Sequence, residues 1–202
     1  MSRESIILRG GEPTIEEGLV FARYLDEAAE GFMRFMLGRR APRILAEAYT
    51  RPDNDYSFRN VVFAEDDGSI VGMASGFTAA ERGRFSDQPL KRAAGYPTVR
   101  MGVVRILRAP LFRLLTSIPD GDFYLLAVAV DDEMQGRGVG STLMDHVEER
   151  ARRNGSRRLC LDVAVKNAGA RRLYEHRGMS VEARWPKLRL LPPLFVRMAK
   201  EL

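Results

Sequence analysis

The chain has 202 residues, of which 45% are hydrophobic and 29% charged, and its formal net charge is +5. This composition is typical of a globular protein with a sizeable core and excludes a fibrous or disordered chain. A single cysteine, Cys160, excludes an internal disulfide framework. The sequence has no signal-peptide core and no apolar run of about 20 residues, so we expect a cytoplasmic protein without membrane insertion. No linker-like stretch interrupts residues 1–202, which predicts one domain.

The first 77 residues predict a strand, two helical segments and a hairpin. In chain order these are a strand at 5–9, a long helical region from 13 to 38, a helix at 42–49 and hairpin strands at 60–65 and 70–77. Pro13 and Thr14 are typical of a helix start. Asp67-Gly68 is the dipeptide of a tight hairpin turn. Methionine and phenylalanine side chains near the end of the helical region recur at helical spacing, which favours packing in the core.

Residues 82–118 follow this hairpin and carry a strong positive charge. Between Arg82 and Arg113 there are eight arginine or lysine side chains and one carboxylate, Asp87, so the segment carries 8 − 1 = +7. Its second half, 99–118, has an amphipathic helical pattern. Three interpretations stay open: a helical insertion packed on the sheet or at a homodimer contact, a lid that selects substrates, or a patch for a membrane surface or nucleic acid. The basic residues lack interleaved aromatic side chains, so we expect no nucleic-acid partner.

The stretch from Tyr124 to Tyr174 is the most informative part of the chain. An almost unbroken apolar run at 124–130 predicts a strand buried on both faces. Glycines then lead into a helical period that starts at Ser141 and ends at Asn154-Gly155, and a second strand is predicted at 159–165. A strand, loop, helix and strand in this order predict two parallel strands joined by a right-handed crossover.

The loop between the first of these strands and the helix is a candidate phosphate-binding site. Gly136, Gly138 and Gly140 let a ligand approach the backbone, and the helix start offers amides without an intrahelical partner. A Walker P-loop needs a Gly-Lys-Ser/Thr sequence, which is absent here. A dinucleotide fingerprint needs Gly-x-Gly-x-x-Gly directly after the strand, but Ser141 holds the last position and a polar turn precedes Gln135. Both of these nucleotide-binding motifs are therefore disfavoured.

Two motifs in this stretch resemble the signatures of the GNAT superfamily of acetyl-CoA-dependent N-acetyltransferases. Gln135-Gly-Arg-Gly138-Val-Gly140 matches the family pattern Gln/Arg-x-x-Gly-x-Gly/Ala. Asn167-Ala-Gly-Ala170-Arg-Arg-Leu173-Tyr174-Glu-His-Arg-Gly178-Met179 matches the pattern Asn-x-x-Ala-x-x-Leu-Tyr-x-x-x-Gly-Met/Phe. Two motifs at the expected separation are far more specific than either one. The close resemblance covers residues 124–184.

The resemblance implies a mixed α/β fold, the GNAT fold: a largely antiparallel sheet of six to seven strands with a central, splayed parallel pair, flanked by helices. Residues 82–118 would then be a helical insertion between strands 3 and 4, and the last strands are expected at 180–185 and 194–198. The implied activity is acetyl transfer from acetyl-CoA to a primary amine of a small molecule. A peptide or protein acceptor and a non-catalytic acyl-CoA-binding module are the alternatives. No metal is expected, since the two histidines lie far apart in sequence.

By the same resemblance, acetyl-CoA would be held by the glycine loop, the strand before it and the start of a later helix. The residues implied are Val128, Ala129, Val130, Gln135, Gly136, Arg137, Gly138, Val139, Gly140, Ser141 and Asn167. In the family, freed strand backbone pairs with pantetheine and the loop amides hold the pyrophosphate. Tyr174 stands where the family has its proton donor to the CoA sulfur, and a phenol is protonated at neutral pH. Asn167 also fits the role of an ordinary helix N-cap.

The motifs do not fix the general base or the acceptor. Asp162 lies on the second parallel strand, where some relatives carry a catalytic glutamate. A carboxylate among apolar neighbours is costly to bury without a partner, so Asp162 is either the base or a structural carboxylate. Asp122 and Glu81 are weaker candidates, and some relatives use a chain of waters. The family builds its acceptor site from variable segments, here 15–50 and 82–115.

Overall fold

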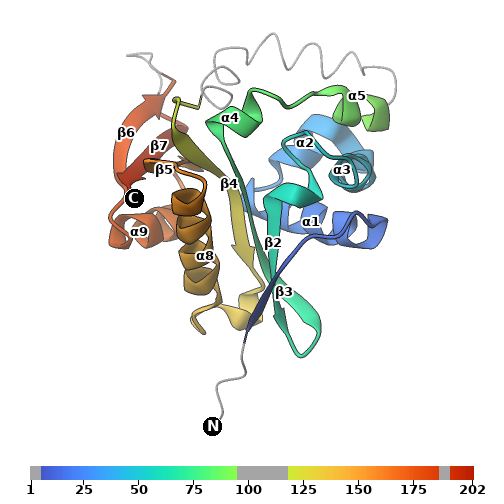
Figure 1. The fold of residues 1–202 in the computed structure, drawn as a ribbon, viewed down its shortest axis with the longest axis horizontal. Helices are drawn as coiled ribbons and strands as arrows, with labels where there is room; N and C mark the ends of the chain where they lie inside the picture. The colour runs from blue at the N-terminus through green and yellow to red at the C-terminus, as the bar shows by residue number, and fades with distance from the viewer. Residues whose placement is uncertain (1–5, 95–117, 187–191) are drawn as a thin grey trace.

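The computed structural model describes residues 6–94, 118–186 and 192–202, and its centre is one seven-stranded sheet (Figure 1). The strands are β1 (Ile7–Gly10), β2 (Val61–Asp66), β3 (Ser69–Thr78), β4 (Asp122–Val130), β5 (Arg158–Ala164), β6 (Ser180–Trp185) and β7 (Phe195–Glu201). Their order is β1-β2-β3-β4-β5-β7-β6. Neighbours run antiparallel except β4 and β5, which are parallel. The predicted fold class is confirmed.

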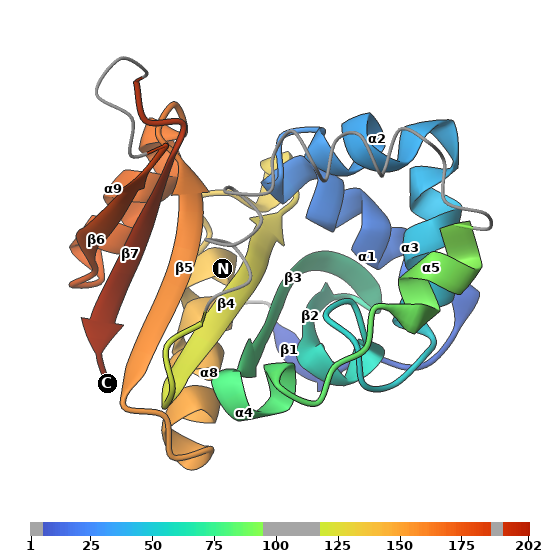
Figure 2. The same ribbon diagram turned by 90° about the horizontal axis from the view of Figure 1, so that it is seen from above.

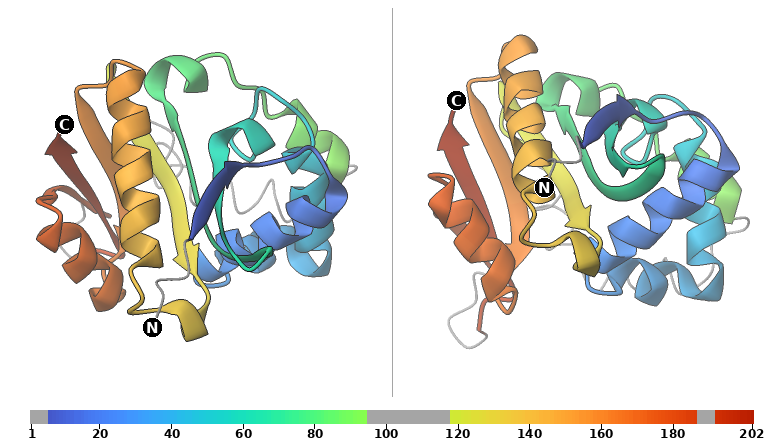
Figure 3. Two further views of the ribbon diagram at one scale, coloured as in Figure 1. Left: turned by 60° about the horizontal axis from the view of Figure 1, so that its bottom comes forward. Right: turned by 90° about the horizontal axis from the view of Figure 1, so that it is seen from below.

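Helices cover the sheet on both faces, with the glycine-loop helix on one and the N-terminal helices on the other (Figure 3). The longer helices are α1 (Ile15–Ala28), α2 (Phe32–Leu37), α3 (Ala41–Tyr49), α5 (Gln88–Ala94), α8 (Val139–Arg153) and α9 (Ala168–His176), and α4 (Ala79–Arg82) is one short turn. Side chains of α8 and α9 pack on β4, β5 and β7, in a core that includes Leu143 and Met198. Side chains of α1 and α3 pack on β2 and β3, in a core that includes Phe21 and Phe63.

The predicted helical region from 13 to 38 is two helices. Thr14 caps the first helix, since its hydroxyl accepts a hydrogen bond from the Glu17 N–H (3.2 Å). After Ala28 the backbone takes two successive left-handed residues, Glu30 (φ 52°) and Gly31 (φ 81°), which a right-handed helix cannot accommodate. Gly31 then starts α2. The break turns α2 away from α1 and creates a bend that borders the cavity described below.

The charged insertion is described only in its first part. Thr78 and Glu81 form a reciprocal capping box at α4, in which the Glu81 carboxylate accepts from the Thr78 N–H (2.8 Å). Helix α5 follows at Gln88–Ala94. The amphipathic pattern at 99–118 lies almost wholly outside the described residues, as do Arg105 and Arg108.

The central parallel pair separates after a short contact. β4 and β5 pair from Asp122 opposite Arg158 to Leu125 opposite Leu161, and there the pairing stops. At the next residue, Leu126, β4 carries a bulge, since Ser75 of β3 faces Ala127 while Gly76 faces Leu125. A bulge adds a residue to one strand, bends that strand and increases its twist. Beyond Leu126 the two strands diverge (Figure 2), as predicted for the splayed pair.

Candidate active site

A cavity of about 740 Å³ lies at this separation of β4 and β5. Its walls come from the adjoining ends of β4 and β5, from α9, from the bend between α1 and α2, and from α4. Apolar side chains such as Leu126, Phe32 and Phe77 contribute much of the lining. Among the described residues, the charged side chains of the lining are Glu30, Asp55, Arg82, Asp162 and Lys166.

Tyr174 reaches the cavity from α9. Asn167 caps this helix, because its side-chain oxygen accepts a hydrogen bond from the Ala170 N–H (3.0 Å), and Asn167 also lines the cavity. The Tyr174 side chain is only 7% exposed, and burial raises its pKa to about 12. The phenol therefore keeps its proton at neutral pH. An apolar pocket that holds a protonated phenol at its wall can supply that proton to a departing anion.

The glycine loop carries the chain from β4 into α8. Gly136 (φ 76°) and Gly138 (φ 90°) have left-handed backbones, and a Cβ built on either glycine would meet no heavy atom within 4 Å. The first helical hydrogen bond of α8 runs from the Thr142 N–H to the Gly138 carbonyl (3.0 Å), so the amides of 139–141 have no acceptor within the helix. The loop thus presents an open backbone surface and a positive helix end, which suits a phosphate group.

The residues next to the glycines are suited to support the loop. Gln135 donates a hydrogen bond from Nε2 to Asp132 Oδ1 (2.7 Å), which ties the loop to the preceding turn. Arg137 and Ser141 are exposed, Val139 is buried in the core, and Gly140 has space for a methyl group 3.7 Å from Val130 Cγ2.

The three strand residues predicted to bind pantetheine differ in the direction of their backbone groups. The Asp131 N–H donates to the Val71 carbonyl (3.0 Å), so the backbone of Asp131 faces β3. Backbone groups alternate sides along a strand, and Ala129 therefore also faces β3, its register partner being Met73. The N–H and C=O groups of Val128 and Val130 face the side of β4 from which β5 has diverged. No strand among the described residues pairs with this side of β4 beyond Leu125, so these two residues offer strand backbone to a ligand.

Asp162 is held by two partners. Arg197 donates from Nε to Oδ1 (3.0 Å) and from Nη2 to Oδ2 (2.7 Å), and the Tyr124 hydroxyl donates to Oδ2 (3.1 Å). Burial, followed by the charge of Asp162, raises the pKa of Tyr124 well above its ordinary value. The carboxylate is therefore a hydrogen-bonded member of a buried cluster at the cavity wall.

The two weaker base candidates lie apart from the cavity lining. Glu81 is engaged in the capping box of α4, and Asp122 is buried at the start of β4, where burial raises its pKa. Cys160, expected to be an inert buried thiol, is fully buried, and burial raises its pKa to about 12.

Sequence reasoning missed the charged pairs that border the cavity. Lys166 Nζ lies 2.5 Å from Glu30 Oε2 and connects the start of α9 to the bend after α1. Arg82 Nε lies 2.9 Å from Asp55 Oδ1 and connects α4 to the loop after α3. No local pattern in the sequence indicates either pair, because the partners are far apart along the chain.

A mixed sheet whose parallel pair separates beside a glycine loop, with a buried phenol in the gap, defines an acyltransferase fold and site. The family model described as "Acetyltransferase (GNAT) family" matches residues 24–179, and the chain belongs to this family. This confirms the predicted family and the predicted class of enzyme.

Similar proteins agree with this assignment. A solved structure titled as an acetyltransferase is 25% identical, has a TM-score of 0.64 and covers 96% of this chain and 98% of its own. A putative GNAT-family acetyltransferase from Desulfovibrio desulfuricans has the same fold, with 19% identity, a TM-score of 0.60 and coverage of 98% and 99%. A mycothiol acetyltransferase from Beutenbergia cavernae is 40% identical over 75 residues, which are 36% of this chain and a quarter (25%) of that relative. In the described part of the chain, no helix is long and apolar enough to cross a membrane.

Proposed function

We propose that the protein transfers the acetyl group of acetyl-CoA to a primary amine of a small molecule, in a complex that holds both substrates. The observation that carries the proposal is the buried, protonated Tyr174 in the wall of a cavity that opens where β4 and β5 diverge. The separate ends of the cavity, one near the start of α9 and one near α4, suit two different substrates. Acetyl transfer also agrees with the name of the mycothiol acetyltransferase relative.

The residues fit acetyl-CoA at the glycine loop. Gly136 and Gly138 leave open space where side chains would stand, and the amides of Val139, Gly140 and Ser141 can donate to phosphate oxygens. Gln135 and Arg137 would support the loop from its flanks, and Asn167 would contact CoA near the start of α9. Acetyl-CoA supplies an acetyl group that is activated as a thioester.

Strand β4 would hold the remainder of this substrate through main-chain groups. Val128 and Val130 offer N–H and C=O groups on the side where no described strand pairs with them, and Ala129 fixes β4 to β3. These backbone groups belong to a sheet, so they keep a fixed orientation at no entropic cost on binding.

Tyr174 would donate its proton to the sulfur that leaves when the amine attacks. A phenol whose pKa is raised to about 12 stays protonated until that charge develops. The acceptor amine must also lose a proton. The base role predicted for Asp162 is disfavoured by its hydrogen bonds to Arg197 and Tyr124, which already engage both oxygens. We propose that water accepts this proton and that Asp162 positions the cavity wall.

Release of CoA in the presence of acetyl-CoA and a panel of amines and peptides tests the proposal. We expect turnover with one class of small primary amine and about a 100-fold lower kcat in Tyr174→Phe. Turnover only with peptides or protein lysines would move the activity to a macromolecular acceptor. Binding of acetyl-CoA without turnover of any acceptor would identify a non-catalytic binding module.

A further inference from the structure

The end of the cavity near α4 is built around an ion pair that the proposed chemistry does not use. Arg82, the last residue of α4, and Asp55, in the loop after α3, both line the cavity. Their side chains are 24% and 23% exposed, so solvent screens the pair only in part. The capping box formed by Thr78 and Glu81 holds α4 in place, and this sets the position of the Arg82 backbone.

The contact between Arg82 and Asp55 leaves much of the guanidinium available. Arg82 Nε lies 2.9 Å from Asp55 Oδ1, and this buried oxygen accepts no hydrogen bond from any described residue. No second carboxylate within the described ranges forms an ion pair with Arg82. A guanidinium carries five N–H donors in a planar fork, and the Nη side of that fork matches a carboxylate with two parallel hydrogen bonds.

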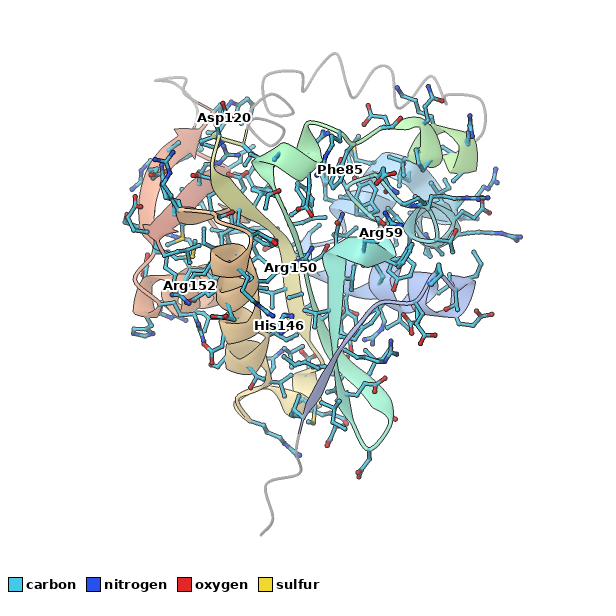
Figure 4. The ribbon with its side chains drawn as sticks, viewed as in Figure 1. Arg59, Phe85, Asp120, His146, Arg150 and Arg152 are labelled. Carbon is cyan, nitrogen blue, oxygen red and sulfur yellow. The ribbon has the colours of Figure 1, made fainter. Side chains whose placement is uncertain are left out.

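The surroundings of Arg82 are aromatic. Phe77 and Tyr56 line the same end of the cavity. Phe85, labelled just after α4 in Figure 4, packs edge-on against Phe77 at 5.1 Å between ring centroids. Burial, followed by the charge of Asp55, raises the pKa of the Tyr56 hydroxyl above its ordinary value, so this side chain is neutral at physiological pH. The described residues at this end of the cavity therefore combine the Arg82 cation, paired with Asp55, with an apolar wall.

We propose that Arg82, oriented by Asp55, binds the carboxylate of the acceptor, so that the acceptor is an amine with an apolar body and a carboxylate, such as an aromatic or branched amino acid. This inference rests on the proposed function. A site that hydrogen-bonds a carboxylate favours the acid over its neutral analogue, because a partly buried guanidinium makes stronger, charge-assisted hydrogen bonds to the acid. The proposal therefore predicts discrimination between an acid and its amide.

The decisive measurement compares phenylalanine and leucine with their carboxamides as acceptors at fixed acetyl-CoA. The wild-type enzyme should acetylate the acids with a KM about 10-fold or more below that of the amides. Arg82→Gln should raise the KM of the acids at least about 10-fold and leave the KM of the amides and of acetyl-CoA unchanged. Arg84→Gln is the matched control: the side chain is exposed, outside the cavity lining and two residues away, and its removal should change none of these values.

A charge-swapped variant separates recognition from structure. Asp55→Arg combined with Arg82→Asp keeps opposite charges in the two positions, and Arg82→Lys keeps the charge but removes the planar fork. If Arg82 binds the carboxylate of the acceptor, the charge-swapped variant should melt near the wild-type temperature while the acids remain poor acceptors. Arg82→Lys should raise the KM of the acids with little loss of stability. Recovery of acid acetylation in the swap, or an equal loss for acids and amides in Arg82→Gln, would overturn the proposal.

Failure of the proposed function itself would give a different result. If acetyl-CoA raises the melting temperature but no amine is acetylated, the catalytic proposal is wrong and the Arg82 site is judged by binding. Phenylalanine should then stabilise the wild-type protein more than phenylalaninamide does, and Arg82→Gln should abolish this difference. Equal stabilisation by the two compounds would refute carboxylate recognition.

Discussion

Asp162 and Arg197 stand directly opposite one another in the β5–β7 register and form a buried ion pair with two hydrogen bonds, of 3.0 and 2.7 Å. Their side chains are 2% and 7% exposed. Asp162 is the first residue of β5 beyond its last pairing with β4, and Tyr124 of β4 donates a hydrogen bond to it across the opening (3.1 Å). The pair thus joins β4, β5 and β7 by side chains at the point where the two parallel strands separate.

Substitution of this pair should separate structure from catalysis at Asp162. Asp162→Asn removes the carboxylate that accepts two hydrogen bonds from the buried Arg197, so the free energy of unfolding should fall by about 3–5 kcal/mol. Asp162→Leu with Arg197→Met removes both charges and should recover most of that loss. If Asp162 only positions the cavity wall, the double variant keeps kcat within about 10-fold of wild type, in contrast to the larger loss that follows removal of a general base. Urea unfolding and steady-state kinetics measure the two quantities, and an inactive but stable double variant would contradict a purely structural role for the pair.

Tyr174→Phe should lower kcat by about 100-fold and leave the affinity for acetyl-CoA unchanged, because only the transferable proton is removed. The wild-type kcat should show no alkaline loss due to Tyr174 up to about pH 10, since burial raises the pKa of the phenol to about 12. An alkaline fall in kcat near pH 8 that disappears in Tyr174→Phe would contradict this environment for the phenol.

The free energy of unfolding should depend on the ionisation of Tyr174 at high pH and should fall as the pH rises. The pKa of Tyr174 is higher in the folded chain than the ordinary value of 10.0 expected after unfolding. The stabilising contribution is therefore complete below pH 10 and is lost as the pH rises toward 12, because the unfolded chain ionises first. The difference between wild type and Tyr174→Phe in the free energy of unfolding should change only in that range.

The elements and the position of the glycine loop were predictable because their signals are local. Hydrophobic period, helix caps and glycines fixed the limits of β4, α8 and β5 to within two residues, and the motif around Gly138 indicated the phosphate-binding loop. The break between α1 and α2 was missed because the Met- and Phe-rich period continues across it, although Gly31 was available as a stop signal.

The partners of the charged side chains were not predictable. Asp162 meets Arg197 because of the β5–β7 register, and Asp55 meets Arg82 because the loop after α3 passes close to α4. Neither contact can be read from a pattern of neighbouring residues in the sequence. The bulge at Leu126 was not predictable either, because a residue added to a uniformly apolar strand leaves the hydrophobic pattern unchanged.

Gly18→Ala should destabilise the protein although alanine is the better helix former. A Cβ at Gly18 of α1 would lie 2.8 Å from both the Cα and the carbonyl oxygen of Ala46 in α3. These are backbone atoms, so the helices must move apart, at a cost of about 1–3 kcal/mol that exceeds the gain of up to about 1 kcal/mol in helix propensity. Thermal unfolding measures the net loss. Gly140→Ala in α8, where the new methyl group has ordinary contact space, should not lower the melting temperature.

Substitutions at Gly138 test whether the glycine loop binds acetyl-CoA. Gly138 has a φ of 90°, so any side chain there adds backbone strain of about 1 kcal/mol or more. Gly138→Asp alone would therefore mix strain with ligand repulsion. Gly138→Asn has the same shape and tolerates left-handed backbone similarly, but it is neutral. The comparison of Asp with Asn isolates the charge.

If the amides of 139–141 hold the CoA pyrophosphate, Gly138→Asp should bind acetyl-CoA at least about 10-fold more weakly than Gly138→Asn, because the added carboxylate repels phosphate across a short distance. The two variants should melt at similar temperatures without ligand. Their stabilisation by acetyl-CoA should differ, since that shift grows with the ratio of ligand concentration to Kd. Gly140→Ala, which keeps the family pattern Gly-x-Gly/Ala, should retain full stabilisation. Equal affinities in the Asp and Asn variants would place the pyrophosphate away from this helix end and remove the loop from the site.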